Sequence, residues 1–122
     1  MQKHPNTKHK LRIENEIAIH RLCKSKFVVQ VYKCNESDIT TYMFLEVCPY
    51  GDLYKLMKVL RYFDEERTKF YMACVFEAIS FIHSKNVAYR DLKLENLVLT
   101  RNGYVKLTDF GISKVLTPGK LF

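Results

Sequence analysis

The sequence has 122 residues, of which 48% are hydrophobic and 27% are charged. This balance is typical of a globular chain that forms one domain or part of one, and it argues against a disordered protein. The net charge of +7 is compatible with acidic or phosphorylated partners, including nucleic acid. A solvated basic surface, or an excerpt from a larger and more balanced protein, explains it equally well. Since no nucleic-acid-binding module accompanies the charge, we expect no nucleic-acid partner.

The cysteines and the apolar runs indicate an intracellular protein. The four cysteines are far apart and form no CxxC pair, so we expect free thiols, which suit a reducing compartment. No apolar run approaches the roughly 18 residues that a membrane helix needs. The first residues also lack the apolar segment of a secretory signal. These features predict no membrane span and a cytoplasmic location.

The first third of the chain predicts a helix followed by a hairpin. Residues 1–9 form a basic segment that we expect to be irregular. Apolar residues then recur near helical spacing from about Lys10 to Cys23, which predicts an amphipathic helix. Two β-rich runs, Phe27–Cys34 and Ile39–Glu46, flank the turn residues 35–38 and predict an antiparallel hairpin. The helical stripe consists of Ile13, Ile17 and Leu22.

The remainder predicts two helices and a second hairpin. Leu53–Leu60 is compatible with a short helix, and a long helix is expected over about 64–84, where Asp64 is placed to cap it. The dipeptide Asn102-Gly103 between the apolar runs 97–99 and 104–107 is a strong hairpin signal. The predicted fold class is therefore α+β.

Two loops carry the residues that indicate chemistry. Transfer of a phosphoryl group from a nucleotide needs a carboxylate that orients the acceptor hydroxyl and takes its proton. It also needs a cation for the transferred group and oxygen ligands for metal ions. Asp91, Lys93 and Asn96 lie in the loop before the second hairpin, and Asp109 follows that hairpin directly. A lone Asp or Asn in a loop is more often a cap or a turn residue, but the ordered set is far more specific.

This ordered set resembles the catalytic loop and the metal-binding loop of eukaryotic protein kinases. The run Tyr89-Arg90-Asp91, with Tyr where His is commoner, is similar to the AGC group. The segment from Phe63 to Lys85 looks most like cyclic-GMP-dependent kinases. About residues 10–120 can be laid along that family. The resemblance implies a partial protein-kinase fold and ATP-dependent transfer of the γ-phosphate to Ser or Thr hydroxyls, with Mg²⁺.

The resemblance implies a role for each loop residue. Asp91 would be the catalytic base, and Lys93 would contact the transferring phosphate. Arg90 would tie the catalytic loop to the activation segment. Asn96 and Asp109 would bind magnesium. Further on, Lys114 matches a lysine that meets the phosphate of the activation loop in this group.

Other positions would bind nucleotide and substrate. In the part that resembles the hinge, Leu45 would be the gatekeeper, and the backbones of Glu46 and Cys48 would bind adenine. Glu16 matches the glutamate that pairs with the nucleotide-binding lysine, although an ordinary exposed glutamate explains it as well. Asp52 is expected at the nucleotide and, together with Glu95, at the basic residues of a protein substrate. For Glu95, a plain surface charge is an equal alternative.

The sequence also departs from the family pattern. It contains no glycine-rich loop and no strand lysine of the Val-Ala-Ile-Lys type, and it stops in the activation segment. We therefore expect a partial domain: a small-lobe part over about 10–46, a hinge over 46–52 and a large-lobe part over 53–122. The alternative is a catalytically inactive, truncated pseudokinase that acts as a protein-binding module.

Two substitutions stand out. Leu94 replaces the usual proline of the catalytic loop, and His20 replaces an apolar residue that stacks toward Phe110. A packed neutral histidine ring is costly to bury unless it is hydrogen-bonded.

Overall fold

The computed structural model describes residues 5–36 and 40–117, and side chains for residues 10–35 and 40–117. Within these residues it contains three α-helices and three antiparallel two-stranded sheets, which confirms the predicted α+β class. The elements in chain order are α1 (Pro5–Leu22), β1 (Val31–Glu36), β2 (Thr41–Leu45), α2 (Leu53–Leu60), α3 (Glu65–Ser84), β3 (Val87–Ala88), the 3₁₀ helix η1 (Leu94–Asn96), β4 (Leu97–Leu99), β5 (Val105–Leu107) and β6 (Lys114–Val115).

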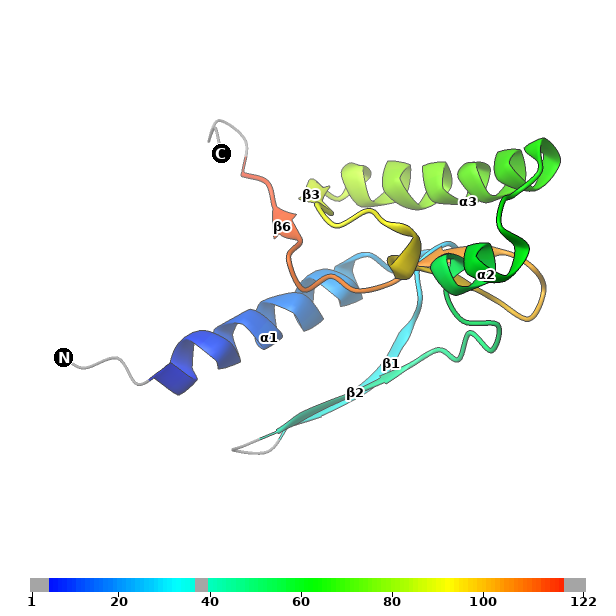
Figure 1. Cartoon of the computed structure of the whole chain (residues 1–122). Coiled ribbons are helices and arrows are strands. Elements are labelled where there is room, and N and C mark those ends of the chain that lie inside the picture. The colour runs from blue at the N-terminus through cyan, green and yellow to red at the C-terminus, as the bar shows by residue number, and fades with distance from the viewer. Residues whose placement is uncertain (1–4, 37–39, 118–122) are drawn as a thin grey trace.

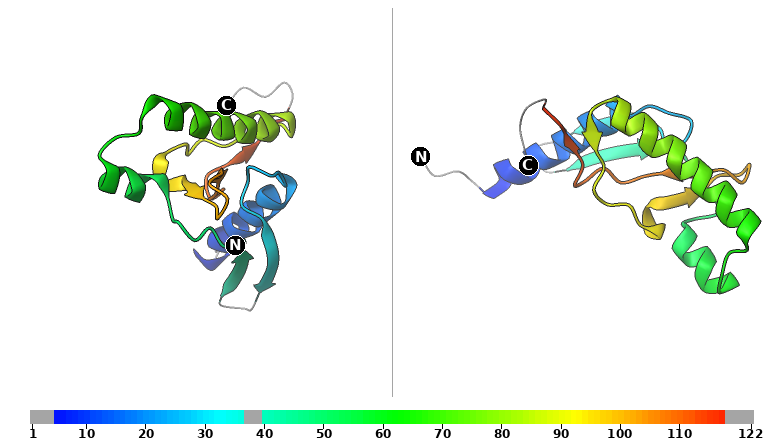
Figure 2. Two further views of the ribbon diagram at one scale, coloured as in Figure 1. Left: turned by 90° about the vertical axis from the view of Figure 1, so that its right-hand side faces the viewer. Right: turned by 90° about the horizontal axis from the view of Figure 1, so that it is seen from above.

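The short strands and loops of the second half lie between the two long helices. Helix α3 runs along one side of this layer and α1 crosses the other side, while the β1–β2 hairpin extends away from α3 (Figures 1 and 2). Buried apolar residues from α1, α3, β4 and β5 meet in one core, in which Ile19, Ile82, Leu107 and Phe110 are almost fully buried. The core therefore supports the loops from both sides.

Helix α1 begins earlier than predicted. It starts at Pro5, so residues 5–9 are helical and the irregular segment expected over 1–9 was wrong there; residues 1–4 lie outside the described part. Proline is well suited to the first turn of a helix, because its fixed φ is helical and its missing N–H has no partner there. The buried face was also only partly predicted, since Ile17 is buried but Leu22 is 46% exposed.

The run Phe27–Cys34 divides between two partners. Its first part lies beside β5, where the Val29 N–H donates to the Leu107 carbonyl at 2.9 Å and the Leu107 N–H donates to the Phe27 carbonyl at 2.8 Å. Only from Val31 onward does the chain pair with β2, with a register shift between Val31 and Lys33. The predicted hairpin is thus present, displaced toward the C-terminus, and the predicted turn residues 37–38 lie outside the described part.

Both later helices begin at an aspartate cap. The Asp52 side chain accepts the Lys55 N–H at 2.8 Å and starts α2, and the Asp64 side chain accepts the Arg67 N–H at 2.7 Å and starts α3. Helix α3 stops near Asn86, which adopts a positive φ of 54°. Asparagine tolerates this left-handed conformation better than most residues, which explains the stop.

Two short pairings place the loops. Strands β4 and β5 pair as predicted, and Gly103 closes their connection with φ 82° and an N–H that donates to the Thr100 carbonyl. Strands β3 and β6 were not predicted. They pair Ala88 with Lys114 and so bring the beginning and the end of the segment 87–115 together. No helix among the described residues is long and apolar enough to cross a bilayer.

Candidate active site

The predicted catalytic loop is organised around the carboxylate of Asp91. The Lys93 ammonium lies 2.9 and 3.0 Å from its two oxygens, and the Asn96 Nδ2 donates to Oδ2 at 2.9 Å and to the Asp91 carbonyl at 3.0 Å. Asn96 is buried, whereas Asp91 is partly exposed. The structure thus brings together three of the predicted site residues and leaves the Asp91 side chain 25% exposed.

The charges in this cluster keep Asp91 ionised. The hydrogen bond from Lys93 lowers the pKa of Asp91, and the amide of Asn96 adds to this effect. The same contact with Asp91 raises the pKa of Lys93, so both groups stay charged near neutral pH. An ionised carboxylate with a cation beside it is the arrangement that accepts a hydroxyl proton near an anionic group.

The loop after β5 is held against the catalytic loop by a buried aromatic pair. Phe110 is fully buried, and Tyr89 packs edge-on against it with ring centroids 5.4 Å apart. The Tyr89 hydroxyl donates to the Thr108 carbonyl, and the Ser113 hydroxyl donates to the Tyr89 carbonyl at 3.0 Å. Burial raises the pKa of Tyr89, so the hydroxyl remains a donor. Asp109 therefore lies between Thr108, which is hydrogen-bonded to Tyr89, and Phe110, which packs against the Tyr89 ring.

Arg90 makes a second connection between the two loops. Its Nε donates to the carbonyl of Ile112 at 2.7 Å, two residues after Phe110. Arg90 has a positive φ of 68°, which is unusual for an arginine and turns its side chain toward this segment. Arg90 therefore contacts the segment that follows Asp109, and its role as a tie between a catalytic loop and an activation segment stays a prediction.

Asn96 and Asp109 have the donor atoms that magnesium prefers. The side-chain amide of Asn96 donates through Nδ2, which leaves Oδ1 as an acceptor. The backbone carbonyl of Asn96 accepts the N–H of Thr108, the residue before Asp109, at 3.0 Å. One carboxylate oxygen of Asp109 accepts the Gly111 N–H at 3.0 Å. In the part of the chain that the structure describes, no group of three or more His, Cys, Asp or Glu side chains could hold a metal alone. This set fits Mg²⁺, which commonly binds one or two protein oxygens together with phosphates.

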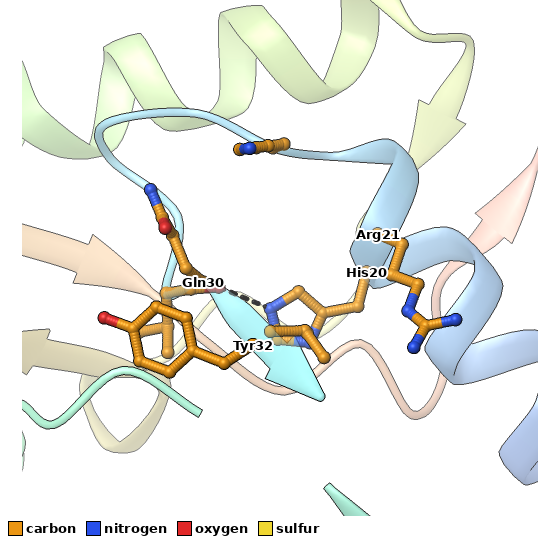
Figure 3. A pocket seen from close by; sticks show the side chains of 7 residues that line it. His20, Arg21, Gln30 and Tyr32 are labelled. Atoms are coloured by element: carbon orange, nitrogen blue, oxygen red, sulfur yellow. Dashed lines mark hydrogen bonds between the residues drawn. The ribbon is translucent and has the colours of Figure 1, made fainter. Parts of the chain in front are cut away.

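His20 is a buried histidine with one hydrogen bond. Its ring stacks on Phe110 with centroids 4.6 Å apart, and Nε2 lies 2.7 Å from the Val29 carbonyl, to which it donates (Figure 3). The ring is buried, and no described residue makes a hydrogen bond with Nδ1. Burial lowers the pKa of His20, so the neutral form with hydrogen on Nε2 is favoured.

Glu16 lies beside the loop that contains Asp109 and Gly111, and no described cation pairs with it. A Cβ added at Gly111 would lie 3.6 Å from Glu16 Oε2, so the carboxylate is close to the loop backbone. Burial and the negative charge of Asp109 raise the pKa of Glu16. None of the ion pairs between described residues includes Glu16. The expected pairing with a lysine remains a prediction.

The predicted hinge is joined to β5 by an ion pair. Leu45 ends β2 and is half-buried, and the Glu46 N–H donates to the Gln30 carbonyl at 2.9 Å. The Glu46 carboxylate accepts Lys106 Nζ at 2.6 and 2.7 Å. Burial raises the pKa of the Cys48 thiol, and the Cys48 carbonyl accepts the Gly51 N–H at 3.3 Å. The Glu46 side chain is therefore occupied structurally, and the adenine-binding role of this segment stays a prediction.

The remaining predicted residues lie outside the Asp91 cluster. Asp52 is the N-cap of α2 and also pairs with Lys55, Glu95 is exposed in η1, and Lys114 is exposed in β6. Helix α2 packs against η1, so Asp52 and Glu95 belong to neighbouring elements.

Lys106 is the residue that sequence reasoning missed. A lysine alternating with Val105 and Leu107 is typical of a solvent-facing strand position, and nothing local pointed to Glu46.

The described geometry agrees with what comparison with known proteins finds. The chain matches the family model for the protein kinase domain over residues 1–121. It is 40% identical over 114 residues to a cGMP-dependent protein kinase, isozyme 2, of Drosophila melanogaster, which covers 93% of this chain and 12% of that protein. It is 38% identical over 115 residues to cGMP-dependent protein kinase 2 of Homo sapiens, covering 94% and 15%. The chain thus spans less than a sixth of the length of these relatives.

Proposed function

Because this chain belongs to the protein kinase family, we propose that it carries the catalytic loop of an ATP-dependent serine/threonine kinase. The observation that supports this proposal most directly is the partly exposed Asp91 carboxylate, held by Lys93 and Asn96 at 2.9–3.0 Å. Family members use ATP and Mg²⁺ in general. Here the substrates would be protein Ser or Thr hydroxyls in basic sequence contexts, selected by Asp52 and Glu95. The free cysteines suit the reducing cytoplasm.

The roles of the residues follow from their contacts. Asp91 would orient the acceptor hydroxyl and take its proton, while Lys93 would stabilise the charge of the phosphoryl group during transfer. Asn96 and Asp109 would hold Mg²⁺, which neutralises the phosphates of the nucleotide when it is bound. Tyr89, Phe110 and Arg90 keep the two loops in register.

Substitution of Asp91 by Asn tests this proposal. In the full-length protein, Asp91→Asn should lower kcat for peptide phosphorylation by at least a factor of about 100, because the group that takes the proton is lost. The matched control is Asp64→Asn, which replaces a distant aspartate and retains a helix cap. Radiolabelled ATP and a serine peptide provide the measurement. Equal activity of the two variants would contradict the proposed role.

The alternative is a catalytically inactive, protein-binding module. This alternative is favoured if the full-length protein places no cation beside Glu16, whose pKa is raised by burial and by Asp109. Binding of Mg·ATP to the full-length protein separates the two candidates. Saturable binding together with phosphoryl transfer supports the kinase, whereas tight partner binding without transfer supports the module.

A further inference from the structure

Asp52 serves two purposes that compete with each other. As the N-cap of α2, it accepts the Lys55 N–H through Oδ1 at 2.8 Å. Its other oxygen, Oδ2, lies 3.3 Å from the Nζ of the same residue. Both oxygens are therefore engaged by one lysine that follows three positions later.

This arrangement affects how Asp52 could bind a substrate. Recognition of arginine by a carboxylate is strongest when two parallel N–H groups reach both oxygens. Here one oxygen accepts the helix backbone, and Lys55 competes with an arginine for the other. The Lys55 side chain is 79% exposed, so its charge also lies in solvent where a basic substrate would approach.

Glu95 differs from Asp52 in this respect. It is exposed in η1, the element that packs against α2, and no ion pair between described residues includes it. The two acidic side chains assigned to a basic substrate thus differ in availability: Asp52 is paired with Lys55, and Glu95 is in no ion pair between described residues.

We propose that Lys55 is a specificity-determining residue that competes with a substrate arginine for Asp52 and transfers most of the arginine selection to Glu95. This inference rests on the proposed assignment of Asp52 and Glu95 to basic substrates. Exposed ion pairs contribute little, so the competition lowers arginine preference by about two- to fivefold.

Peptide binding to the full-length protein tests the inference without requiring catalysis. Two fluorescent serine peptides are compared by anisotropy, one with arginines before the serine and one with citrulline, the uncharged analogue. The ratio of the two Kd values cancels effects on folding. Lys55→Met should raise the arginine preference about two- to fivefold, and the control Lys58→Met, one turn later on α2, should leave it unchanged.

The same change is repeated in an Asp52→Asn background, in which asparagine retains the cap but not the charge. There Lys55→Met should have no effect beyond that of Lys58→Met, and Glu95→Gln should reduce the preference more than Asp52→Asn does. The inference is overturned if Lys55→Met and Lys58→Met give the same ratio, or if Lys55→Met acts equally with and without Asp52. Phosphoryl transfer is assayed separately, so a protein that binds peptides with these ratios but transfers no phosphate refutes only the catalytic part of the proposed function.

Discussion

At the scale of single residues, buried polar groups determine how the loops are held. Lys106 and Glu46 are 60 positions apart, and their side chains are only 12% and 21% exposed. Removing one member of such a pair leaves the other charge poorly solvated, which costs more than the pair itself contributes. The hinge therefore depends on a residue of the distant β5 strand.

Lys106→Met should lower the free energy of unfolding by about 2 kcal/mol, because Glu46 would lose a charged hydrogen-bond donor. The control is Lys69→Met, which breaks the exposed pair with Glu65 on α3 and should cost less than about 0.5 kcal/mol. Urea-induced unfolding measures both variants. Similar losses would show that the pair with Glu46 is as weak as a surface pair.

His20 makes the same region sensitive to acid. Its pKa is lowered from an ordinary value near 6.5, so the unfolded chain binds the proton more readily than the folded chain. The stability that the neutral ring contributes is present above that ordinary value and is lost as the pH falls below it. Protonation would also place an N–H at Nδ1, with which no described residue makes a hydrogen bond.

Substitution of His20 by Leu should therefore reduce the loss of stability between pH 7.5 and pH 5.5. Thermal unfolding at the two pH values measures the difference, and His83→Gln at an exposed position of α3 is the matched control. The interpretation is refuted if the Leu variant loses as much stability as the wild-type protein and the control.

At the scale of elements, local signals sufficed where a helix has its own cap and apolar face. Asp64 and the buried residues that follow it made α3 predictable almost to the residue, and Asn102-Gly103 did the same for the β4–β5 connection. Local signals failed where an element depends on a distant partner. The two-residue strands β3 and β6 are too short to show periodicity, and Val29 turns toward β5 because of contacts with Leu107.

The same contrast between local signals and distant partners applies to the candidate site. Asp91, Lys93 and Asn96 are close in sequence and were found together, as expected for one loop. The pairing of Glu46 with Lys106 joins separate parts of the chain and leaves no pattern in either. The role of Asp52 as a helix cap was not predicted, because its acidic character was already explained by a nucleotide and a basic substrate.

The cap of α3 should be measurable. Asp64→Ala removes the acceptor for the Arg67 N–H and should destabilise the protein by about 1 kcal/mol, whereas Asp64→Ser, which keeps an oxygen in place, should cost much less. Thermal unfolding followed by circular dichroism at 222 nm compares the variants. Equal losses would indicate that the side-chain charge, rather than the cap, is important.

At the scale of the whole molecule, the chain exposes a large apolar surface. On helix α3, Met72 and Phe76 lie one turn apart on the same side and are 54% and 74% exposed. Such a face is typical of a surface that packs against further protein.

The 122-residue chain on its own should therefore bind a hydrophobic dye such as ANS under native conditions. Replacing Met72 and Phe76 together by Gln should reduce the dye fluorescence, because both side chains face solvent and neither belongs to the core. A pair of polar replacements at Lys58 and Lys69 is the control. Absent dye binding, or no change in the apolar variant, would show that this face is covered in solution.

The pairing of β3 with β6 closes the segment from Val87 to Val115 into a ring of backbone. Both the catalytic loop and the Asp109 loop belong to this ring, and the contact between Thr108 and Asn96 crosses its interior. A closed ring has fewer independent torsions than two free loops, so ordering one loop lowers the entropic cost of ordering the other. A ligand that immobilises Asp109 therefore also helps to immobilise Asp91, even without touching it.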